Sequence, residues 1–205
     1  TYHSVEIGNF YWLTENMHYL PYVNPQWKKG PPGIFVYGYT GDDEEIAMQT
    51  DAYDKYGVLY TWEAAIEACP DPWRLPSDAE WMDLERALGM ETTYDQIGWR
   101  PEGNVGEALK TTSGWIWDTN DMAFVGTNSS GFSAVPSGYG SAYKDQENFS
   151  FEGSGARYWS STDDRDNAYS RWLWVYDQDV SRDLSPKRLG FSVRCVLDVS
   201  DDGSN

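Results

Sequence analysis

The segment from Tyr158 to Val196 combines two kinds of position, and this combination constrains the chain more than any other feature. One kind forms a frame of apolar, small and arginine residues, and the other holds acidic, aromatic and serine residues between them. A frame of this kind predicts a fixed scaffold that displays the intervening side chains. The frame consists of Tyr158, Trp159, Ser160, Ser161, Thr162, Arg171, Leu173, Val180, Arg182 and residues 190–196.

The chain contains 11 Trp and 15 Tyr among 205 residues, with few Ile and Leu. Aromatic side chains of this kind bring a large contact area and, in Tyr and Trp, a polar edge that tolerates water. This composition favours short strands and loops braced by aromatic rings. The length fits a single domain over residues 1–205, and the Pro, Gly and acidic residues of 19–54 predict a loop insertion.

The formal net charge of −18 excludes nucleic acid as a partner, because the protein repels phosphate backbones. The acidity serves either solubility or the attraction of cations and basic partners. The sequence has no apolar run long enough to cross a bilayer, so we expect no direct membrane insertion. Thr1 in place of Met suggests that a leader or another upstream part has been removed.

Cys69 and Cys195 are the two cysteines, 126 positions apart. Neither has a second Cys or His nearby, so they do not form a metal-binding pattern. They are either a disulfide or two buried free thiols. A disulfide would close a long loop, stabilise the fold by roughly 4 to 5 kcal/mol in the chain-entropy model, and imply an oxidising compartment.

Helix signals are clearest in the first half of the chain. Helical spacing predicts a short helix that ends at Cys69, before Pro70. Ser77 and Glu80 form a capping box for a second helix, and Gly89 stands where a helix-ending glycine belongs. A brief third helix is expected over 105–109. Strands are expected at 10–13 and 132–136, and around Trp159, Leu173, Val175, Phe191, Val193 and Cys195.

Several blocks resemble the Fibrobacter succinogenes major paralogous domain family, and they run in order across nearly the whole chain. The blocks are residues 12–17, 56–62, 69–70, 73–81, 109–110, 131–138, 158–162 and 190–196. The order of elements also resembles the C-type lectin-like fold. The resemblance implies an α+β fold with two short helices, small antiparallel sheets and extensive irregular loops. In that fold a cysteine late in the first helix is joined to one on the last strand, which implies a Cys69–Cys195 disulfide.

Related domains are extracellular, and some are variable proteins of diversity-generating retroelements, in which a C-terminal region is rewritten and displayed to ligands. The resemblance implies a cell-surface or virion-surface module whose diversified region spans about 158–188 and binds a protein or other macromolecular ligand. Asp, Ser, Arg and Tyr arise by changing adenines of an Asn codon, whereas Trp172, Trp174 and Gln178 need other template codons. The expected ligand-binding residues are Asp163, Asp164, Arg165, Asp166, Ser170, Trp172, Trp174, Tyr176, Asp177, Asp179, Ser181, Asp183, Leu184 and Ser185.

Alternation places Ser170, Trp172, Trp174 and Tyr176 on one face of an extended segment, and Leu173 and Val175 on the other. We expect the aromatic set to face outward as anchors for a ligand; the alternative is that the Trp residues form the core side. The nearby acidic residues provide oxygen ligands for a hard cation or are ordinary solvated carboxylates. We expect no metal and no cofactor.

Two further functions compete with the display module. A surface adhesin or carbohydrate-binding module would use the same region with fixed specificity, although the chain lacks the Glu-Pro-Asn and Gln-Pro-Asp triplets of calcium-dependent sugar-binding lectins. The block Arg74 to Trp81 also resembles formylglycine-generating enzymes, which need a reactive thiol. His3 and His18 have no nucleophile motif around them, so we expect no enzymatic activity.

Overall fold

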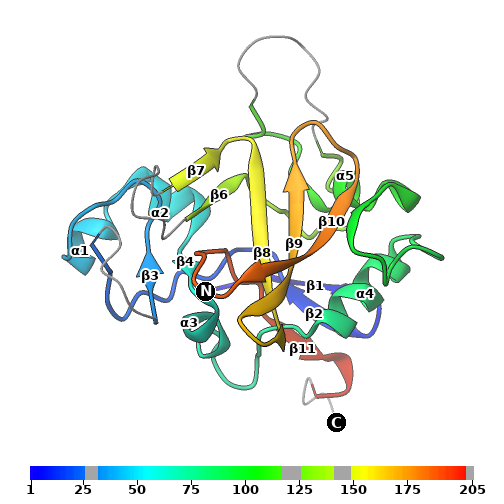
Figure 1. The fold of residues 1–205 in the computed structure, drawn as a ribbon, viewed down its shortest axis with the longest axis horizontal. Helices are drawn as coiled ribbons and strands as arrows, with labels where there is room; N and C mark the ends of the chain where they lie inside the picture. Colours follow the sequence, from blue (N-terminus) through cyan, green and yellow to red (C-terminus); the bar gives the residue numbers. More distant parts are fainter. Residues whose placement is uncertain (26–31, 117–125, 141–148, 202–205) are drawn as a thin grey trace.

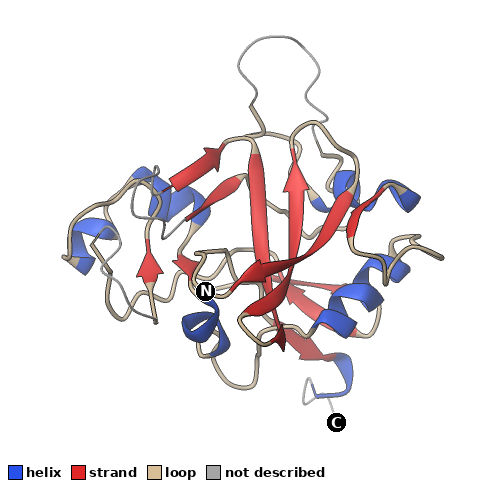
Figure 2. Cartoon of the chain, viewed as in Figure 1, coloured by secondary structure: helices blue, strands red, loops and turns tan. Residues whose placement is uncertain are grey.

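The computed structural model describes residues 1–25, 32–116, 126–140 and 149–201, and it has helices and strands in three sheets (Figures 1 and 2). The α+β class predicted from the sequence is confirmed. The strands are β1 (Ser4–Ile7), β2 (Phe10–Leu13), β3 (Ile34–Phe35), β4 (Leu59–Tyr60), β5 (Gly98–Arg100), β6 (Ser137–Gly140), β7 (Phe149–Glu152), β8 (Gly155–Asp164), β9 (Asn167–Trp174), β10 (Val180–Pro186) and β11 (Val196–Asp198).

The largest sheet has six strands in the order β5-β10-β9-β8-β6-β7. Its centre is the long β8–β9 hairpin, which stands upright in the middle of Figure 1. β10 pairs with β9 so that Ser181 lies opposite Trp172, and β5 pairs with β10 so that Trp99 lies opposite Ser181. These pairings bring segments far apart in the sequence onto one sheet.

One of the two smaller sheets joins the ends of the chain. β2 pairs with β1 on one side and with β11 on the other, so the N- and C-terminal segments share a sheet. The strand predicted at 10–13 is therefore confirmed as β2. β3 and β4 form the third sheet.

The α-helices are short: α1 (Glu44–Ala47), α2 (Asp51–Tyr56), α3 (Trp62–Ile66), α4 (Asp78–Ala87) and α5 (Val105–Leu109), with 3₁₀ turns η1 (Glu102–Asn104) and η2 (Val199–Asp201). The capping box of α4 is confirmed, because Ser77 Oγ accepts from the Glu80 amide and the Glu80 carboxylate accepts from the Ser77 amide. α5 also agrees with the prediction. α3 ends three residues before Cys69, since the backbone leaves helical geometry at Glu67.

The Cys69–Cys195 disulfide is confirmed. It joins the segment after α3 to the residue before β11, with the two Cα atoms 5.8 Å apart. The alternative of two free thiols is thereby excluded.

Three expectations about local structure are wrong. The strand expected around Phe191, Val193 and Cys195 does not form: Phe191 makes only an isolated bridge to Tyr60, and β11 begins at Val196. Segment 19–54, apart from 26–31, which lies outside the described residues, is not a simple loop: it contains β3, α1 and α2, and Leu20, Val23, Ile34, Val36 and Ala47 are buried. Scattered apolar residues there pack into the core although their spacing shows no period. The strand expected at 132–136 is an irregular segment with one bridge, Lys110 to Ala134, because Ser133 has a positive φ of 58°. The next strand, β6, begins at Ser137.

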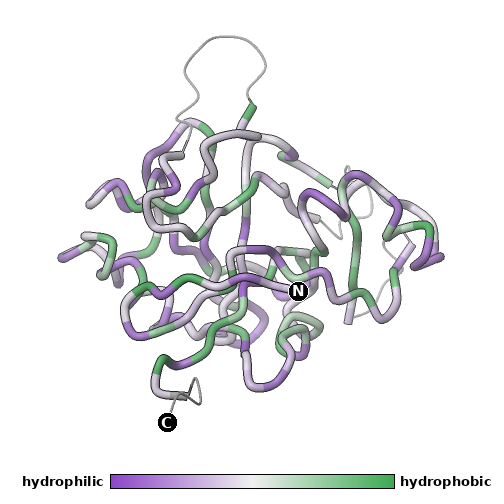
Figure 3. The backbone as a smooth tube through the Cα atoms, turned by 180° about the vertical axis from the view of Figure 1, so that it is seen from behind, coloured by the Kyte–Doolittle hydropathy of each residue, from purple (hydrophilic) through white to green (hydrophobic). Residues whose placement is uncertain are grey.

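Two clusters of buried residues form the core, one around Trp159 and Phe191, the other around Trp12, Trp81 and Tyr158. Figure 3 shows hydrophobic and hydrophilic residues alternating over short stretches of the tube rather than in long apolar runs. Across the described part of the chain, no helix has the length and apolarity needed to cross a membrane.

Candidate ligand-binding surface

The two faces of strand β9 differ in character. Arg171 and Leu173 are buried on the face that α4 covers, and Val175 continues this buried set just after the strand. Trp172 and Trp174 alternate with them and are partly exposed on the other face. The expectation that Leu173 and Val175 face the core while the Trp residues face outward is confirmed.

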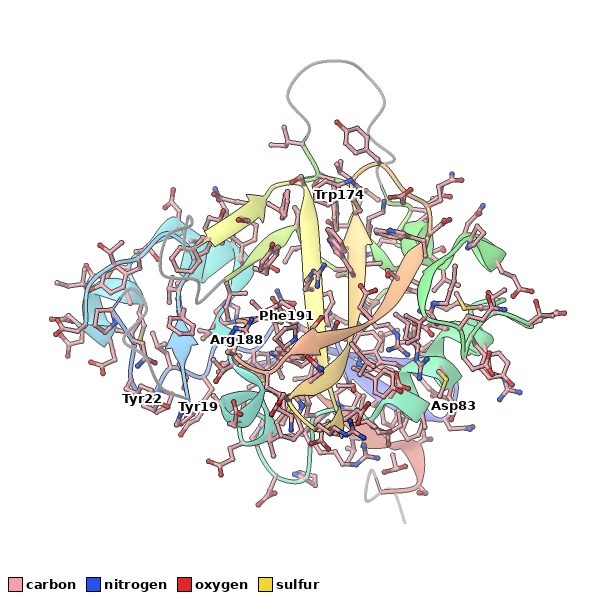
Figure 4. All side chains as sticks on the ribbon, in the orientation of Figure 1. Tyr19, Tyr22, Asp83, Trp174, Arg188 and Phe191 are labelled. Atoms are coloured by element: carbon pink, nitrogen blue, oxygen red, sulfur yellow. A yellow bond between two sulfur atoms is a disulfide. The ribbon has the colours of Figure 1, made fainter. Side chains whose placement is uncertain are left out.

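The outward indoles of β9 belong to a continuous group of rings, which we call the aromatic surface: Trp99, Phe151, Trp172 and Trp174. Trp172 lies 5.5 Å from Trp99 of β5 and 5.4 Å from Trp174, measured between ring centroids. Phe151 of β7 meets Trp174 edge to face at 4.9 Å. Trp99 and Phe151 keep 41% and 40% of their surface exposed, so the group offers ring area to a ligand. Figure 4 shows Trp174 at the upper end of the sheet.

A glycine keeps this part of the surface tightly packed. Gly155 of β8 lies opposite Trp174 in the ladder. A Cβ at this position would lie 3.0 Å from the Trp174 ring and 3.2 Å from Trp172 Nε1. Any larger residue would therefore push both indoles away from the sheet.

A hollow of about 450 Å³ opens beside the aromatic surface, between β5, β8 and β10. Trp99 and Trp172 border it, together with Arg157, Asp183 and Leu184. Ligand sites of this kind combine aromatic walls with a few polar groups that fix orientation. The hollow is therefore suited to receive one side chain or one ring of a larger ligand.

Arg157 supports the hollow from β8. Its guanidinium carbon lies 4.0 Å from the centre of the Trp172 ring, and its Nη1 donates to Ser185 Oγ at 3.3 Å. Burial lowers the pKa of the Arg157 guanidinium, although the negative charge of Asp183 opposes the shift. Stacking on the indole is thus the main contact that stabilises this charge.

The inner face of the same sheet is held to α4 by buried ion pairs. Arg171 donates to Asp78 at 2.7 Å and to Glu85 at 2.5 Å. Arg182 donates to Asp78 at 2.6 Å, and Arg100 makes two bonds of 2.7 Å to Glu85. Burial alone would raise the pKa of Asp78, but the hydrogen bonds and charges of Arg182 and Arg171 outweigh it and hold that pKa below its ordinary value. Arg171 and Arg182, predicted as frame residues, therefore fix β9 and β10 in place.

The structure divides the predicted binding residues into two separate groups. Asp163, Asp164, Arg165 and Asp166 are exposed at the tip of the β8–β9 hairpin, where Lys187 forms an ion pair with Asp163. Trp174 and Tyr176 lie at the other end of β9. Strand rise alone separates Asn167 from Trp174 by about 23 Å, so the tip and the aromatic surface lie at opposite ends of the strand.

Three predicted binding residues are buried, although two of them, Ser181 and Ser185, line the hollow beside the aromatic surface. Ser170, Ser181 and Ser185 belong to the outward side, yet their exposed fractions are 0%, 1% and 2%. Small side chains between bulky neighbours are covered by them, and the Ser170 and Ser185 hydroxyls bond each other at 2.9 Å. Asp177, Asp179 and Asp183 are partly buried, and Leu184 is exposed.

Trp99, Phe151 and Arg157 are surface residues that the sequence analysis missed. Trp99 and Phe151 come from segments with no periodic signal, and only strand pairing brings them to β9. Arg157 gave no signal either, because it shares the side of Trp159 on the strand, and Trp159 is fully buried. In the part of the chain that the structure describes, no three acidic, His or Cys side chains are grouped to hold a metal ion.

Comparison with known proteins gives one match. The family model described as the Fibrobacter succinogenes major domain matches residues 5–197. No curated protein and no solved structure matches the chain. The match spans nearly the whole sequence and includes every strand and loop that forms the aromatic surface, so the chain belongs to the Fibrobacter succinogenes major domain family.

Proposed function

We propose that this protein is a ligand-binding module that presents the aromatic surface, with its adjoining hollow, to a protein or other macromolecular ligand. The main observation in its favour is that Trp99, Trp172 and Trp174 are partly exposed and form a chain of ring contacts. The opposite face of their sheet is bound to α4 by buried ion pairs. Rigid aromatic anchors that lose little entropy on binding dominate the energy of many protein interfaces.

The charge of the protein bears on the choice of ligand. Asp183 borders the hollow, and Asp177 and Asp179 follow Trp174 in the turn before β10. With a formal net charge of −18, the protein favours a ligand with a basic rim, since complementary charge speeds encounter and disfavours acidic partners.

The finer form of this proposal is a C-type lectin-like domain that serves as the variable protein of a diversity-generating retroelement. Its support is the separation of roles along β9, where inward Arg171 makes buried ion pairs and inward Leu173 packs in the core, while outward Trp172 and Trp174 stay partly exposed. Under this proposal Trp172 and Trp174 change between copies of the gene, whereas Arg171 and Leu173 stay constant. Sequencing the locus in sibling clones tests this: substitutions at the buried positions, or no substitutions at all, contradict it.

We place the module outside the cytoplasm, on a cell or virion surface. The Cys69–Cys195 disulfide supports this location, because structural disulfides persist in oxidising compartments. Surface labelling of intact cells or virions with an antibody to the domain tests the location.

The binding role is tested by a display library in which Trp99, Phe151, Trp172 and Trp174 are randomised. We expect most members to keep the wild-type fold, with lower stability where Trp172 is replaced because Arg157 loses its stack, and selection against a model basic protein to yield specific binders. A control library randomises exposed apolar residues away from the surface, Ile46, Met48 and Ile66. Equal yields from both libraries, or wholesale unfolding of the first, would contradict the proposal.

The alternative with an observation in its favour is fixed binding of a carbohydrate. Sugars stack on exposed indoles, and the hollow between Trp99 and Trp172 has room for one ring. A glycan array tests it, with Trp99→Ala and a calcium chelator as separate arms. We do not propose formylglycine-generating chemistry, because both cysteines are joined in the disulfide.

A further inference from the structure

A second hollow, of about 510 Å³, lies beside the Cys69–Cys195 disulfide and shares no lining residue with the aromatic surface. Its walls come from the N-terminal segment, from residues 17–19, from α2 and from the chain after α3. We call it the tyrosine pocket, after Tyr2, Tyr19 and Tyr53. His18 and Glu67 also line it.

The walls of the tyrosine pocket are held in place by the tyrosine hydroxyls. Tyr53 Oη donates to the carbonyl of His18 at 2.9 Å, and Tyr2 Oη accepts from the amide of His18 at 2.9 Å. The buried Tyr60 donates to the carbonyl of Tyr19 at 2.6 Å. Because backbone groups occupy the hydroxyls of Tyr2 and Tyr53, these residues offer mainly ring surface to a ligand. The pocket is therefore preformed and aromatic.

His18 connects two of the tyrosine rings. His18 and Tyr53 meet edge to face with centroids 5.0 Å apart, and Tyr2 lies 6.4 Å from His18. Tyr19 keeps 52% of its surface exposed, so it stands at the mouth rather than in the wall. Figure 4 shows Tyr19 and Tyr22 projecting from the same edge of the molecule.

The lining of the tyrosine pocket carries a negative charge. Glu67 is exposed at the end of α3, and none of the residues that line the pocket is Lys or Arg. Burial and then the negative charge of Glu67 raise the pKa of the nearby Tyr22 phenol. The Glu67 carboxylate therefore makes the electrostatic potential at this aromatic edge more negative.

We propose that the tyrosine pocket binds an organic cation of the alkylammonium class. Aromatic faces attract such cations, and cages of rings with a carboxylate at the rim select them over neutral molecules of equal shape. The net charge of −18 draws cations toward the protein and repels anions. This site is independent of the aromatic surface, so either proposal stands if the other fails.

The test uses choline and its neutral isostere, in which a quaternary carbon replaces the nitrogen. Each compound is titrated into the intact protein while the ring signals of Tyr2, Tyr19 and Tyr53 are followed by NMR. We expect saturable shifts with choline and affinity lower by about fivefold or more for the isostere, the usual scale of a cation–π contribution.

Glu63 in α3 and Glu67 at the C-terminal end of that helix are both exposed, so they provide a matched pair of variants. Glu67→Gln removes the rim charge and should weaken choline binding about fivefold, whereas Glu63→Gln, on the same helix but outside the pocket, should not. Tyr19→Ala should also weaken binding without unfolding the protein, because Tyr19 is half exposed. Equal affinity for both compounds, equal effects of the two glutamine variants, or no saturable shift would each overturn the proposal.

Discussion

Arg171 on β9 donates from Nε to Glu85 Oε1 on α4 at 2.5 Å, and both side chains are almost wholly buried. This pair joins the sheet that carries the aromatic surface to the helix behind it. Glu85 also accepts both bonds from Arg100 of β5, so one carboxylate fixes two strands of the sheet.

Glu85→Gln should destabilise the protein by about 3 to 5 kcal/mol, because it leaves Arg100 and Arg171 buried without full compensation. The free energy of unfolding from denaturant titration measures the effect. Asp83→Asn, on the exposed side of the same helix (Figure 4), should change stability by about 0.5 kcal/mol or less. A loss below about 1 kcal/mol for Glu85→Gln would show that the network is not the main tie between sheet and helix.

Arg157→Lys should destabilise the protein by about 1 to 2 kcal/mol, because an ammonium cannot reproduce the flat stack on Trp172. Denaturant unfolding measures the loss, and Trp172 side-chain NMR should show a more mobile ring. Arg165→Lys at the exposed hairpin tip is the control and should have no measurable effect. An Arg157→Met variant as stable as the wild type would show that the charge adds nothing to the stack.

The stability of the protein should rise as the pH increases from about 8 toward 10. Burial lowers the pKa of Lys110 to about 8, although Asp177, Glu107 and Asp179 oppose the shift. Below that pH the folded protein carries the cost of a buried charge; above it the folded state releases the proton that the unfolded state still holds, so stability increases. Unfolding free energies across this range measure the slope.

Two variants separate Lys110 from other groups in this pH range. Lys110→Met should lower stability overall, because Nζ donates to the carbonyls of Trp174 and Asp177, and it should also remove the slope. Lys55→Met, at an exposed position, should retain it. A slope that persists in Lys110→Met would assign the effect to another residue.

Replacing both cysteines by alanine should lower the free energy of unfolding by roughly 4 to 5 kcal/mol, because the disulfide closes a loop of 126 residues in the unfolded chain. Denaturant unfolding of the wild type with and without reductant gives the same comparison without mutation. Agreement between the two methods is expected, and unchanged stability in both would mean that the core alone holds α3 against the last strands.

Local features of the sequence were sufficient to predict α4 and the sides of β9. The capping box at Ser77 and Glu80 depends on residues three apart, and the alternation of Leu173 with Trp172 depends on adjacent ones. Segment 19–54 could not be predicted in the same way. Its buried residues, such as Val23 and Ile34, acquire neighbours only when distant segments fold over them.

The sequence by itself determined the family, the α+β class, the core side of β9 and the frame residues Arg171 and Arg182, because these follow from ordered motifs and from the period of a strand. Only the tertiary structure brings together the rings of the proposed binding surface. Pairing of β5 with β10 places Trp99 against Trp172, from positions 73 residues apart in the sequence. The same sheet carries the acidic hairpin tip away from those rings, because strand rise separates the two ends of β9. Alternation selects the side on which a residue lies, but long-range pairing selects its neighbours.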